Sequence, residues 1–515
     1  MRIKFTRLIL LSLFPLCAMA QGEEFTIIKG GCMPDLLEDG VNHRASRRLP
    51  QRKTDWDADK TYKQMVVLFT FSDQDYTMEN PKEYYQRLFN EHGFNQGYGL
   101  GCVADYYKEQ SGGLVNFEFD IYGPVQVSGK ACPTEGVTNY GRTSMQEATQ
   151  LVLEANPTVD YSQYDWDGNG VIEQVIFVHA GPGGNTGSTA GYIWPNTSSF
   201  PGVTTPDGKR IYNYTASAEI WKFSETTPDY CGIGTICHEF SHSLGLPDIY
   251  PTSGSLYSAV DEWDLMDGGN FTNRGWCPPN FSPLEKMLMG WLTPVALTEK
   301  TTITDMKPIE EGGPVYQIKH TDTEYLLLEN RQWTGWDAGI PGKGLVVYYV
   351  NYDASVWSVN SVNNVSSEAD FRYRLVSADN MTYSEWGDKI KQENLSSYLN
   401  DDRMNRRYLS TSPYPYDTNH ELTNTSTPAA QMKTKNAGDE TLLSKPITNI
   451  QMNSEGLISF DFMADNALGI HQVRQMLEEE SEVLYTLSGQ RVYIPLPGRL
   501  YIAKKKDGTA RKFIY

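Results

Sequence analysis

One short segment near the middle of the chain constrains its fold and chemistry more than any other. His238 and His242 are four residues apart, so on a helix they lie on one face and can bind one metal ion. Glu239 lies between them in sequence, where its carboxylate can act as general base toward water activated by the metal. Gly245 can adopt a positive φ and end the helix, which would bring Asp248 back as a third ligand. Three protein ligands that leave a position open are typical of a catalytic zinc ion, so the segment predicts such a site.

A glycine-rich turn follows this helix and supports the same interpretation. Met266 lies in that turn, where metallopeptidases with a long zinc motif place a methionine under the metal. A methionine alone is more often an ordinary core residue, but its position downstream of this helix favours an apolar floor for the site. Glu262 and Glu285 are nearby acidic residues and remain alternatives to Asp248 as the third ligand.

Composition limits the possible architecture and partners. A chain of 515 residues exceeds the size of a single core, which predicts two or three domains. Apolar residues make up 39% and aromatic residues 12%, enough for folded domains. The formal charge of −20 argues against nucleic acid as a partner, because no basic face could easily accumulate phosphate contacts.

The N-terminus has the features of a secretory signal peptide. Basic residues precede the apolar run Leu8–Leu16, and the small residues of Ala18–Ala20 form a cleavage site, which predicts a signal peptide over 1–20. No later apolar run is long enough to span a membrane, so no transmembrane segment is expected. An oxidising compartment would allow up to three disulfides among the remaining cysteines, and one could brace the zinc helix. Those cysteines are Cys32, Cys102, Cys132, Cys231, Cys237 and Cys277.

Periodicity predicts four regions after the signal peptide. An irregular stretch with several basic residues, over 21–60, is interpreted as a short pro-segment that is trimmed around Arg47–Lys53. Alternating strand and helix patterns over 61–292 predict an α/β (α+β) catalytic domain, and the zinc motif indicates the zincin or metzincin type. Short strands separated by Gly, Pro and Asn turns predict a mainly β accessory domain over 293–465, followed by a small β domain over 466–515.

A second motif predicts calcium binding. Oxygen-bearing side chains stand at loop positions one, three, five and nine, Gly170 allows a sharp turn at six, and a backbone carbonyl is available at seven. These ligand positions are Asp165, Asp167, Asn169, Val171 and Glu173. Position twelve is Ile176 where a complete EF-hand loop has glutamate, so the alternative is an acidic turn without an ion.

Cys32 is the candidate for a latency switch in the pro-segment. It lies in Gly31–Asp35, which is similar to the cysteine switch of matrix metallopeptidases, where a thiolate occupies the open zinc position. The motif lacks the arginine before the cysteine and is one residue short, so a disulfide-bonded or free Cys32 is the competing interpretation.

With these motifs in place, the chain resembles the immune inhibitor A family of secreted bacterial zinc metallopeptidases. The matching features are the strand before Phe71, the acidic loop leading into Val175–Gly181, the block His238–Tyr250, the turn Trp263–Gly269, and Glu324–Arg331. The resemblance implies a secreted endopeptidase made as a zymogen, with protein or peptide substrates. It also implies that His238 and His242 bind zinc, that Glu239 is the base and that Asp248 is the third ligand.

The tail from Val483 to Tyr515 resembles C-terminal domains that sort proteins to the type IX secretion machinery. That resemblance implies export through the periplasm and outer membrane, to the medium or the cell surface. Two other functions remain open: a surface adhesin or glycan-binding protein with an inactive zinc site, and a peptidase selective for glycoproteins. Substrate specificity, oligomeric state and the donor that stabilises the oxyanion do not follow from the sequence.

Overall fold

The computed structural model describes residues 48–135, 137, 139–185, 191–222, 229–253, 258–382, 384–386 and 409–464, and four short strands beyond residue 482. The predicted signal peptide, Cys32 and most of the predicted pro-segment therefore lie outside the described residues. Within the described part, no helix is both long enough and apolar enough to cross a membrane.

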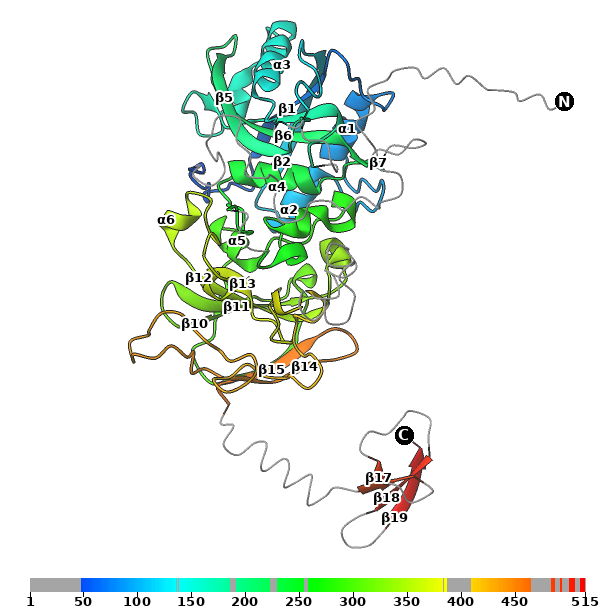
Figure 1. Ribbon diagram of the computed structural model, residues 1–515, viewed down its shortest axis with the longest axis vertical. Coiled ribbons are helices and arrows are strands. Elements are labelled where there is room, and N and C mark those ends of the chain that lie inside the picture. The colour runs from blue at the N-terminus through cyan, green and yellow to red at the C-terminus, as the bar shows by residue number, and fades with distance from the viewer. Residues whose placement is uncertain are drawn as a thin grey trace, which may run out of the picture.

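The N-terminal half is built on a mixed seven-stranded sheet in the order β2-β1-β4-β6-β3, with β5 and β7 also pairing with β6 (Figure 1). Neighbours on the main path run parallel, and β5 and β7 run antiparallel to β6. The strands are β1 (Thr61–Thr70), β2 (Asn116–Gln126), β3 (Val171–Ile172), β4 (Val175–Pro182), β5 (Asn196–Thr204), β6 (Arg210–Lys222) and β7 (Asp229–Tyr230). The helices of this half are α1 (Pro81–Asn90), α2 (Val103–Gln110), α3 (Arg142–Ala155), α4 (Gly234–Ser243) and α5 (Pro283–Leu288).

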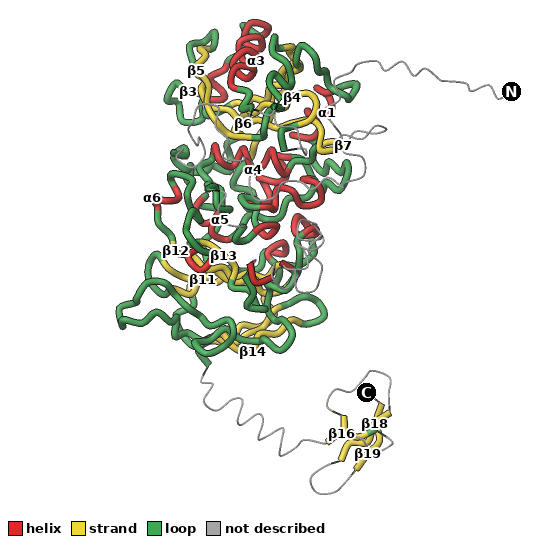
Figure 2. The backbone as a smooth tube through the Cα atoms, in the orientation of Figure 1, coloured by secondary structure: helices red, strands yellow, loops and turns green. Residues whose placement is uncertain are grey.

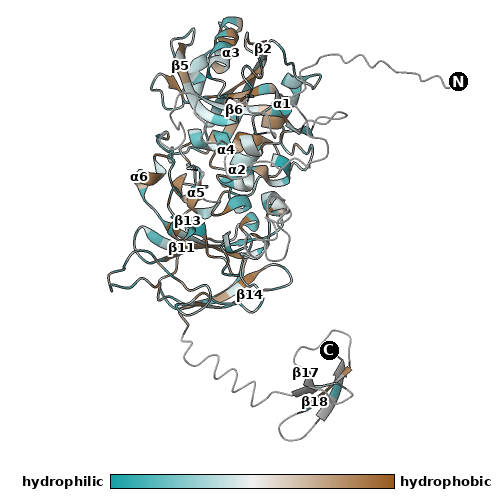
Figure 3. Ribbon diagram, in the orientation of Figure 1, coloured by the Kyte–Doolittle hydropathy of each residue, from teal (hydrophilic) through white to brown (hydrophobic). Residues whose placement is uncertain are grey.

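Both faces of this sheet are covered, and β1 shows how the sequence achieves this. Val66 and Leu68 point into a core shared with α1, α2 and α4, whereas Met65, Val67 and Phe69 point into a second core shared with α3. Successive side chains on a strand face opposite ways, so a strand covered on both faces has a continuous apolar run. Helix α3 packs one face against this second core, and Figure 3 shows both apolar and polar residues along it.

The following region contains two further sheets. The first has the order β13-β12-β11-β10-β8 and is antiparallel except for the β8–β10 pair. The second is antiparallel, in the order β14-β15-β9. Their elements are β8 (Val295–Ala296), β9 (Thr301–Met306), β10 (Tyr316–Lys319), β11 (Glu324–Arg331), β12 (Gly344–Asn351), α6 (Ala354–Trp357), β13 (Tyr373–Leu375), β14 (Ile447–Met452) and β15 (Ile458–Phe462). Short 3₁₀ segments lie at Tyr161–Tyr164, Asp261–Trp263, Gly268–Gly275, Ile309–Glu311, Gly335–Gly339 and Glu368–Asp370.

The two regions share a hydrophobic core. On β12, Tyr348 and Val350 belong to the same buried cluster as α4, whereas Val347 and Tyr349 pack in the cluster that contains the β14-β15-β9 sheet. Figure 2 shows the strands of the second region below α4 and α5, with the β14 layer farthest from them. The β-rich region thus contacts the helix layer that carries the predicted zinc motif.

The mixed α/β architecture with several sheets agrees with the predicted fold class at that level. Strands and helices alternate along the chain from β1 to α4, as the periodicity predicts. Strands β5 and β6 were not predicted. Beyond residue 482 the structure describes a separate four-stranded sheet of β16 (Val483–Tyr485), β17 (Arg491–Val492), β18 (Leu500–Lys504) and β19 (Ala510–Ile514).

The first described residues, which the sequence analysis placed in the pro-segment, pack onto the folded body. The backbone N–H of Leu49 donates to the carbonyl of Ser358 at 2.9 Å. The Trp56 indole donates to the carbonyl of Met289, and its ring packs edge-on against Tyr62. Residues 48–56 therefore form a strap, the N-terminal strap below, that contacts both regions.

Candidate metal centre

Helix α4, which carries the histidines, is buried around its whole circumference. Every residue from Gly234 to His242 is inaccessible to solvent or nearly so. The helix packs against β5 and β6 on one side and against the 3₁₀ segment Gly268–Gly275 on the other. A buried polar side chain is costly unless it has a hydrogen-bond or metal partner. The buried histidines and glutamate of α4 therefore indicate a functional site.

The ring nitrogens of the two histidines have distinct partners. Nδ1 of His238 lies 2.8 Å from the carbonyl oxygen of Leu265, and Nδ1 of His242 lies 2.8 Å from that of Leu246. A carbonyl only accepts hydrogen bonds, so each Nδ1 carries the proton. The neutral ring then has an unprotonated Nε2, which is the state that binds a metal ion.

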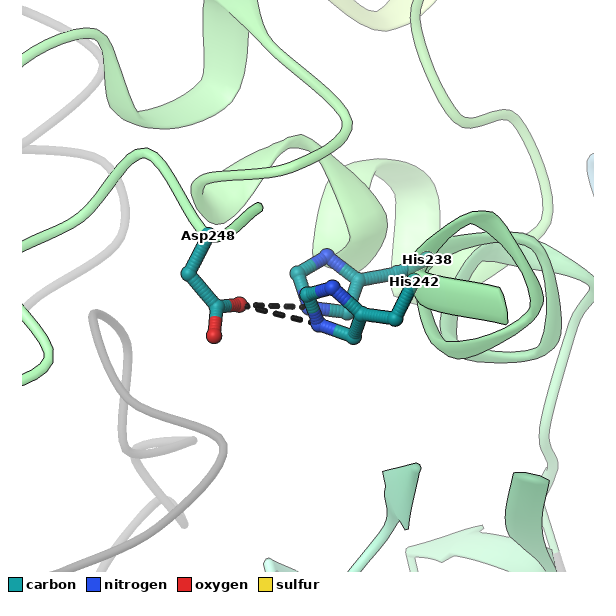
Figure 4. Close-up of side chains that lie close together, drawn as sticks. All are labelled: His238, His242 and Asp248. Atoms are coloured by element: carbon teal, nitrogen blue, oxygen red, sulfur yellow. Dashed lines mark hydrogen bonds and ion pairs between the residues drawn. The ribbon is translucent and has the colours of Figure 1, made fainter. Parts of the chain in front are cut away.

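Asp248 completes the cluster as the sequence predicts. Gly245 has a φ of +95° just after the helix, and the chain turns back so that Asp248 faces the histidines (Figure 4). Its Oδ1 lies 3.1 Å from Nε2 of His238 and 3.2 Å from Nε2 of His242. One ligand atom from each residue lies within 4.8 Å of the others, and all three side chains are buried.

The donor set fits zinc. Two imidazole nitrogens and one carboxylate oxygen are ligands that Zn²⁺ accepts, and three protein ligands leave a position for a reactant. Neither alternative third ligand joins the cluster of described residues: Oε2 of Glu285 instead accepts from the backbone N–H of Ser282 at 2.8 Å and caps α5. Glu262 is buried but is likewise not among the converging groups.

Glu239 is fully buried on the same helix as the histidines, and a residue of β5 contacts it. The hydroxyl of Thr197, on β5, lies 3.0 Å from Oε2 of Glu239 and 2.6 Å from the Glu239 carbonyl oxygen. A residue of β5 therefore fixes both the side chain and the backbone of Glu239. Thr197 was not predicted, because no sequence pattern indicated strand β5.

The turn that contains Met266 is tied to the metal cluster through its backbone. The Leu265 carbonyl accepts from His238, and the Met266 carbonyl accepts from the N–H of Ile249 at 2.8 Å. Asp264 closes the turn by accepting from the Met266 N–H at 2.8 Å. The Met266 side chain is fully buried in the same core as α4. This turn therefore joins α4 to the segment that carries Asp248.

The disulfide expected to brace the helix is not formed. Cys231, Cys237 and Cys277 are free thiols. The Cys237 thiol lies in the main core, and burial raises its pKa well above the ordinary value. Burial also raises the pKa of the Cys277 thiol to about 12, and this thiol donates to the Trp336 carbonyl at 3.3 Å. The disulfide that the sequence allowed among these three cysteines is therefore absent.

The predicted calcium loop brings some of its oxygen atoms together. Carboxylate oxygens of Asp165, Asp167 and Glu173 lie within 4.8 Å of one another. The Asn169 side chain instead bonds within the loop, accepting from Val171 N–H at 2.7 Å and donating to Asp167 at 2.9 Å.

A lysine and a backbone N–H contact the carboxylates of this loop. The Lys209 ammonium lies 2.7 Å from Oδ2 of Asp165, and despite burial this bond holds the pKa of Asp165 below its usual range. Glu173 accepts from the N–H of Trp166, yet burial and the neighbouring aspartates raise its pKa to about 7. Calcium binding at this loop stays a prediction.

A second residue that the sequence analysis missed is Asn360, from the β-rich region. Its amide contacts both the backbone and the carboxylate of Asp248, 112 residues away in sequence. No local signal marks such a residue, because only the packing of the two regions brings the segments together.

A helix with two converging histidines and a buried glutamate, completed by a returning aspartate, places this domain in the class of metallopeptidase catalytic domains. Comparison with known families agrees: residues 53–290 match the family described as immune inhibitor A peptidase M6, catalytic domain. This match over residues 53–290 confirms the predicted resemblance. The match begins at residue 53, within the N-terminal strap.

Individual relatives agree with the family match. Residues of this chain are 28% identical over 248 positions to immune inhibitor A of Bacillus thuringiensis subsp. alesti, covering 41% of this chain and 35% of that protein. They are 25% identical over 263 positions to the pre-pro-metalloprotease PrtV of Vibrio cholerae serotype O1, covering 45% of this chain and 28% of that protein. The similarity thus spans about a third of the length of these relatives.

Proposed function

We propose that this chain is a secreted zinc-dependent endopeptidase that hydrolyses peptide bonds of extracellular proteins. The observation that carries the proposal is the convergence of Nε2 of His238, Nε2 of His242 and Oδ1 of Asp248 beside the buried Glu239. The match to a peptidase catalytic domain supports it.

Each residue of the centre has a defined role in this proposal. His238, His242 and Asp248 would hold zinc, which when bound acts as a Lewis acid toward the peptide carbonyl and the attacking water. Glu239 takes a proton from that water and passes it to the leaving amine. The Thr197 hydroxyl holds the Glu239 carboxylate in position, and Met266 forms the apolar floor beneath the ligands.

The test is cleavage of an unfolded protein substrate by the purified chain, with and without a zinc chelator. Glu239→Gln keeps the size of the side chain and removes the base, so we expect zinc to bind normally and turnover to fall about 10²- to 10⁴-fold. Glu299→Gln is the matched control, because Glu299 is exposed and far from α4 in sequence. Full activity of Glu239→Gln would contradict the mechanism.

Absence of cleavage by a zinc-loaded wild-type chain would favour the adhesin or glycan-binding alternative. Cleavage that depends on glycans attached to the substrate would favour a glycoprotein-selective peptidase. General cleavage of unglycosylated proteins contradicts both alternatives.

Secretion, latency and calcium binding belong to the same proposal. The Vibrio relative is named a pre-pro-metalloprotease, which supports a signal peptide and a pro-segment in this chain. Because the N-terminal strap packs onto both regions, we expect maturation to cleave before Leu49. The C-terminal sheet is proposed to contact secretion machinery, and deletion of residues 466–515 would then retain the protein inside the cell. The convergence of three carboxylates supports calcium at the Asp165 loop.

A further inference from the structure

The loop after α6 reaches from the β-rich region into the metal cluster. Asn360 lies in this loop, is 4% exposed and adopts a φ of +57°. Its Oδ1 accepts from the backbone N–H of Asp248 at 2.6 Å, and its Nδ2 donates to Oδ2 of Asp248 at 2.7 Å. One amide therefore holds both the main chain and the carboxylate of a single residue.

This contact gives the two carboxylate oxygens of Asp248 different environments. Oδ1 faces the histidines, and Oδ2 is occupied by the amide of Asn360. A hydrogen bond to one oxygen fixes the rotation of the carboxylate and directs the other oxygen at the ligand position. The geometry thus favours a single metal-facing oxygen over chelation by both.

Other residues of the loop fix its position independently of Asn360. Asn363 donates to the carbonyls of Ile249 and Tyr373 at 2.9 and 2.8 Å. Asn364 accepts from the Ser253 N–H at 3.0 Å and donates to Thr252 at 2.8 Å. None of these contacts involves His238, His242 or Asp248. A substitution at Asn364 therefore weakens the attachment of the loop without removing the Asn360 amide.

We propose that Asn360 is a positioning residue that sets Asp248 for metal binding, so that the β-rich region completes the metal centre. The family catalytic domain matches only residues 53–290, so the residue that orients one of its ligands lies outside it. The inference rests on the proposed function only in taking zinc as the metal. It concerns zinc affinity and is tested without substrate.

The experiment measures the zinc affinity of the full chain by competition with a chromophoric chelator. Asn360→Gly removes the amide and tolerates the positive φ, whereas Asn360→Asp keeps the size but replaces the donor to Oδ2 with a second carboxylate. We expect both variants to bind zinc about 10- to 100-fold more weakly than wild type. Asn364→Ala is the matched control, with expected affinity close to that of wild type.

Two further readouts separate positioning from folding. Thermal unfolding of the metal-free chains measures how far each substitution destabilises the fold, and zinc affinity is then measured well below the melting temperature of every variant. The visible spectrum of the Co²⁺-substituted protein, which reports ligand geometry, should change in the Asn360 variants alone.

Wild-type zinc affinity in both Asn360 variants would overturn the proposal, and so would equal weakening in Asn364→Ala. A wild-type chain that binds zinc but cleaves nothing would contradict the proposed function and leave this inference standing. A wild-type chain that cleaves protein, with Asn360 variants that bind zinc normally, would contradict this inference alone.

Discussion

The Thr197 hydroxyl on β5 lies 3.0 Å from Oε2 of Glu239 on α4. The same hydroxyl lies 2.6 Å from the Glu239 carbonyl, so one side chain of an edge strand contacts the proposed base twice. Both residues are buried, where a lost hydrogen bond cannot be replaced readily by water.

Thr197→Val, which keeps the shape and removes the hydroxyl, should therefore reduce kcat. Loss of a hydrogen bond to a charged group costs about 1.5–3 kcal/mol, which corresponds to roughly a 10- to 100-fold fall in turnover. Thr197→Ser retains the hydroxyl and should keep most of the activity. Steady-state cleavage of an unfolded protein measures both, and equal rates for the valine and serine variants would contradict a role for the hydroxyl.

The convergence of the three clustered residues could be predicted from sequence because they lie within one short segment. His238, His242 and Asp248 are brought together by a helix and a glycine, both of which leave local signals. Thr197 and Asn360 leave no local sequence signal, because their contacts depend on packing between distant segments.

Other features depend on contacts between distant residues that sequence patterns do not reveal. The three cysteines around α4 allowed a disulfide, yet all three are free thiols, and Cys237 and Cys277 are buried. The N-terminal strap resembled a removable segment because it has basic residues and no periodicity. Its anchoring depends on Leu49 and Trp56, whose partners lie hundreds of residues away.

Arg331 is expected to be essential for stability of the region beneath the metal cluster. Its fully buried guanidinium contacts both oxygens of Asp337, Oε1 of Glu329 at 2.9 Å and the carbonyl of Trp263 at 3.4 Å. Arg331→Met leaves two buried carboxylates without their counter-charge, which should lower the free energy of unfolding by about 3–5 kcal/mol.

The control for this change is Arg372→Met. Its guanidinium is partly exposed and lies 3.9 Å from Asp353, so we expect a loss of under about 1 kcal/mol. Urea unfolding followed by tryptophan fluorescence measures both variants. Equal stabilities for the two would show that the buried network contributes little.

Glu173 should make the stability of the metal-free chain depend on pH. Burial raises its folded pKa to about 7 from an ordinary value of 4.5. A carboxyl with a raised folded pKa contributes stability that is complete below pH 4.5 and is lost as pH rises through about 7. After allowance for solvent screening, wild type should lose about 1–2 kcal/mol more than Glu173→Gln between those limits.

Urea unfolding at a series of pH values tests this expectation, with Glu299→Gln as an exposed control. Added Ca²⁺ should cancel the loss in wild type, because a cation favours the ionised carboxylate. Parallel pH profiles for wild type and Glu173→Gln would contradict the raised pKa. Lack of any calcium effect would contradict ion binding at this loop.

The N-terminal strap should determine where trimming can occur without loss of the fold. Leu49 is buried and bonds to Ser358, Arg52 donates to the Tyr352 hydroxyl at 2.9 Å, and Trp56 packs against Tyr62. A chain that begins at Arg48 keeps these contacts, whereas one that begins at Asp57 loses all of them. Removal of a largely packed tryptophan alone costs about 2–3 kcal/mol, so the shorter chain should unfold at a clearly lower temperature. Scanning calorimetry of both chains, with Trp56→Ala in the longer one, measures this cost. Equal melting temperatures would show that the strap can be removed without loss of stability. Proteolytic trimming anywhere in the predicted range up to Lys53 would then be compatible with the fold.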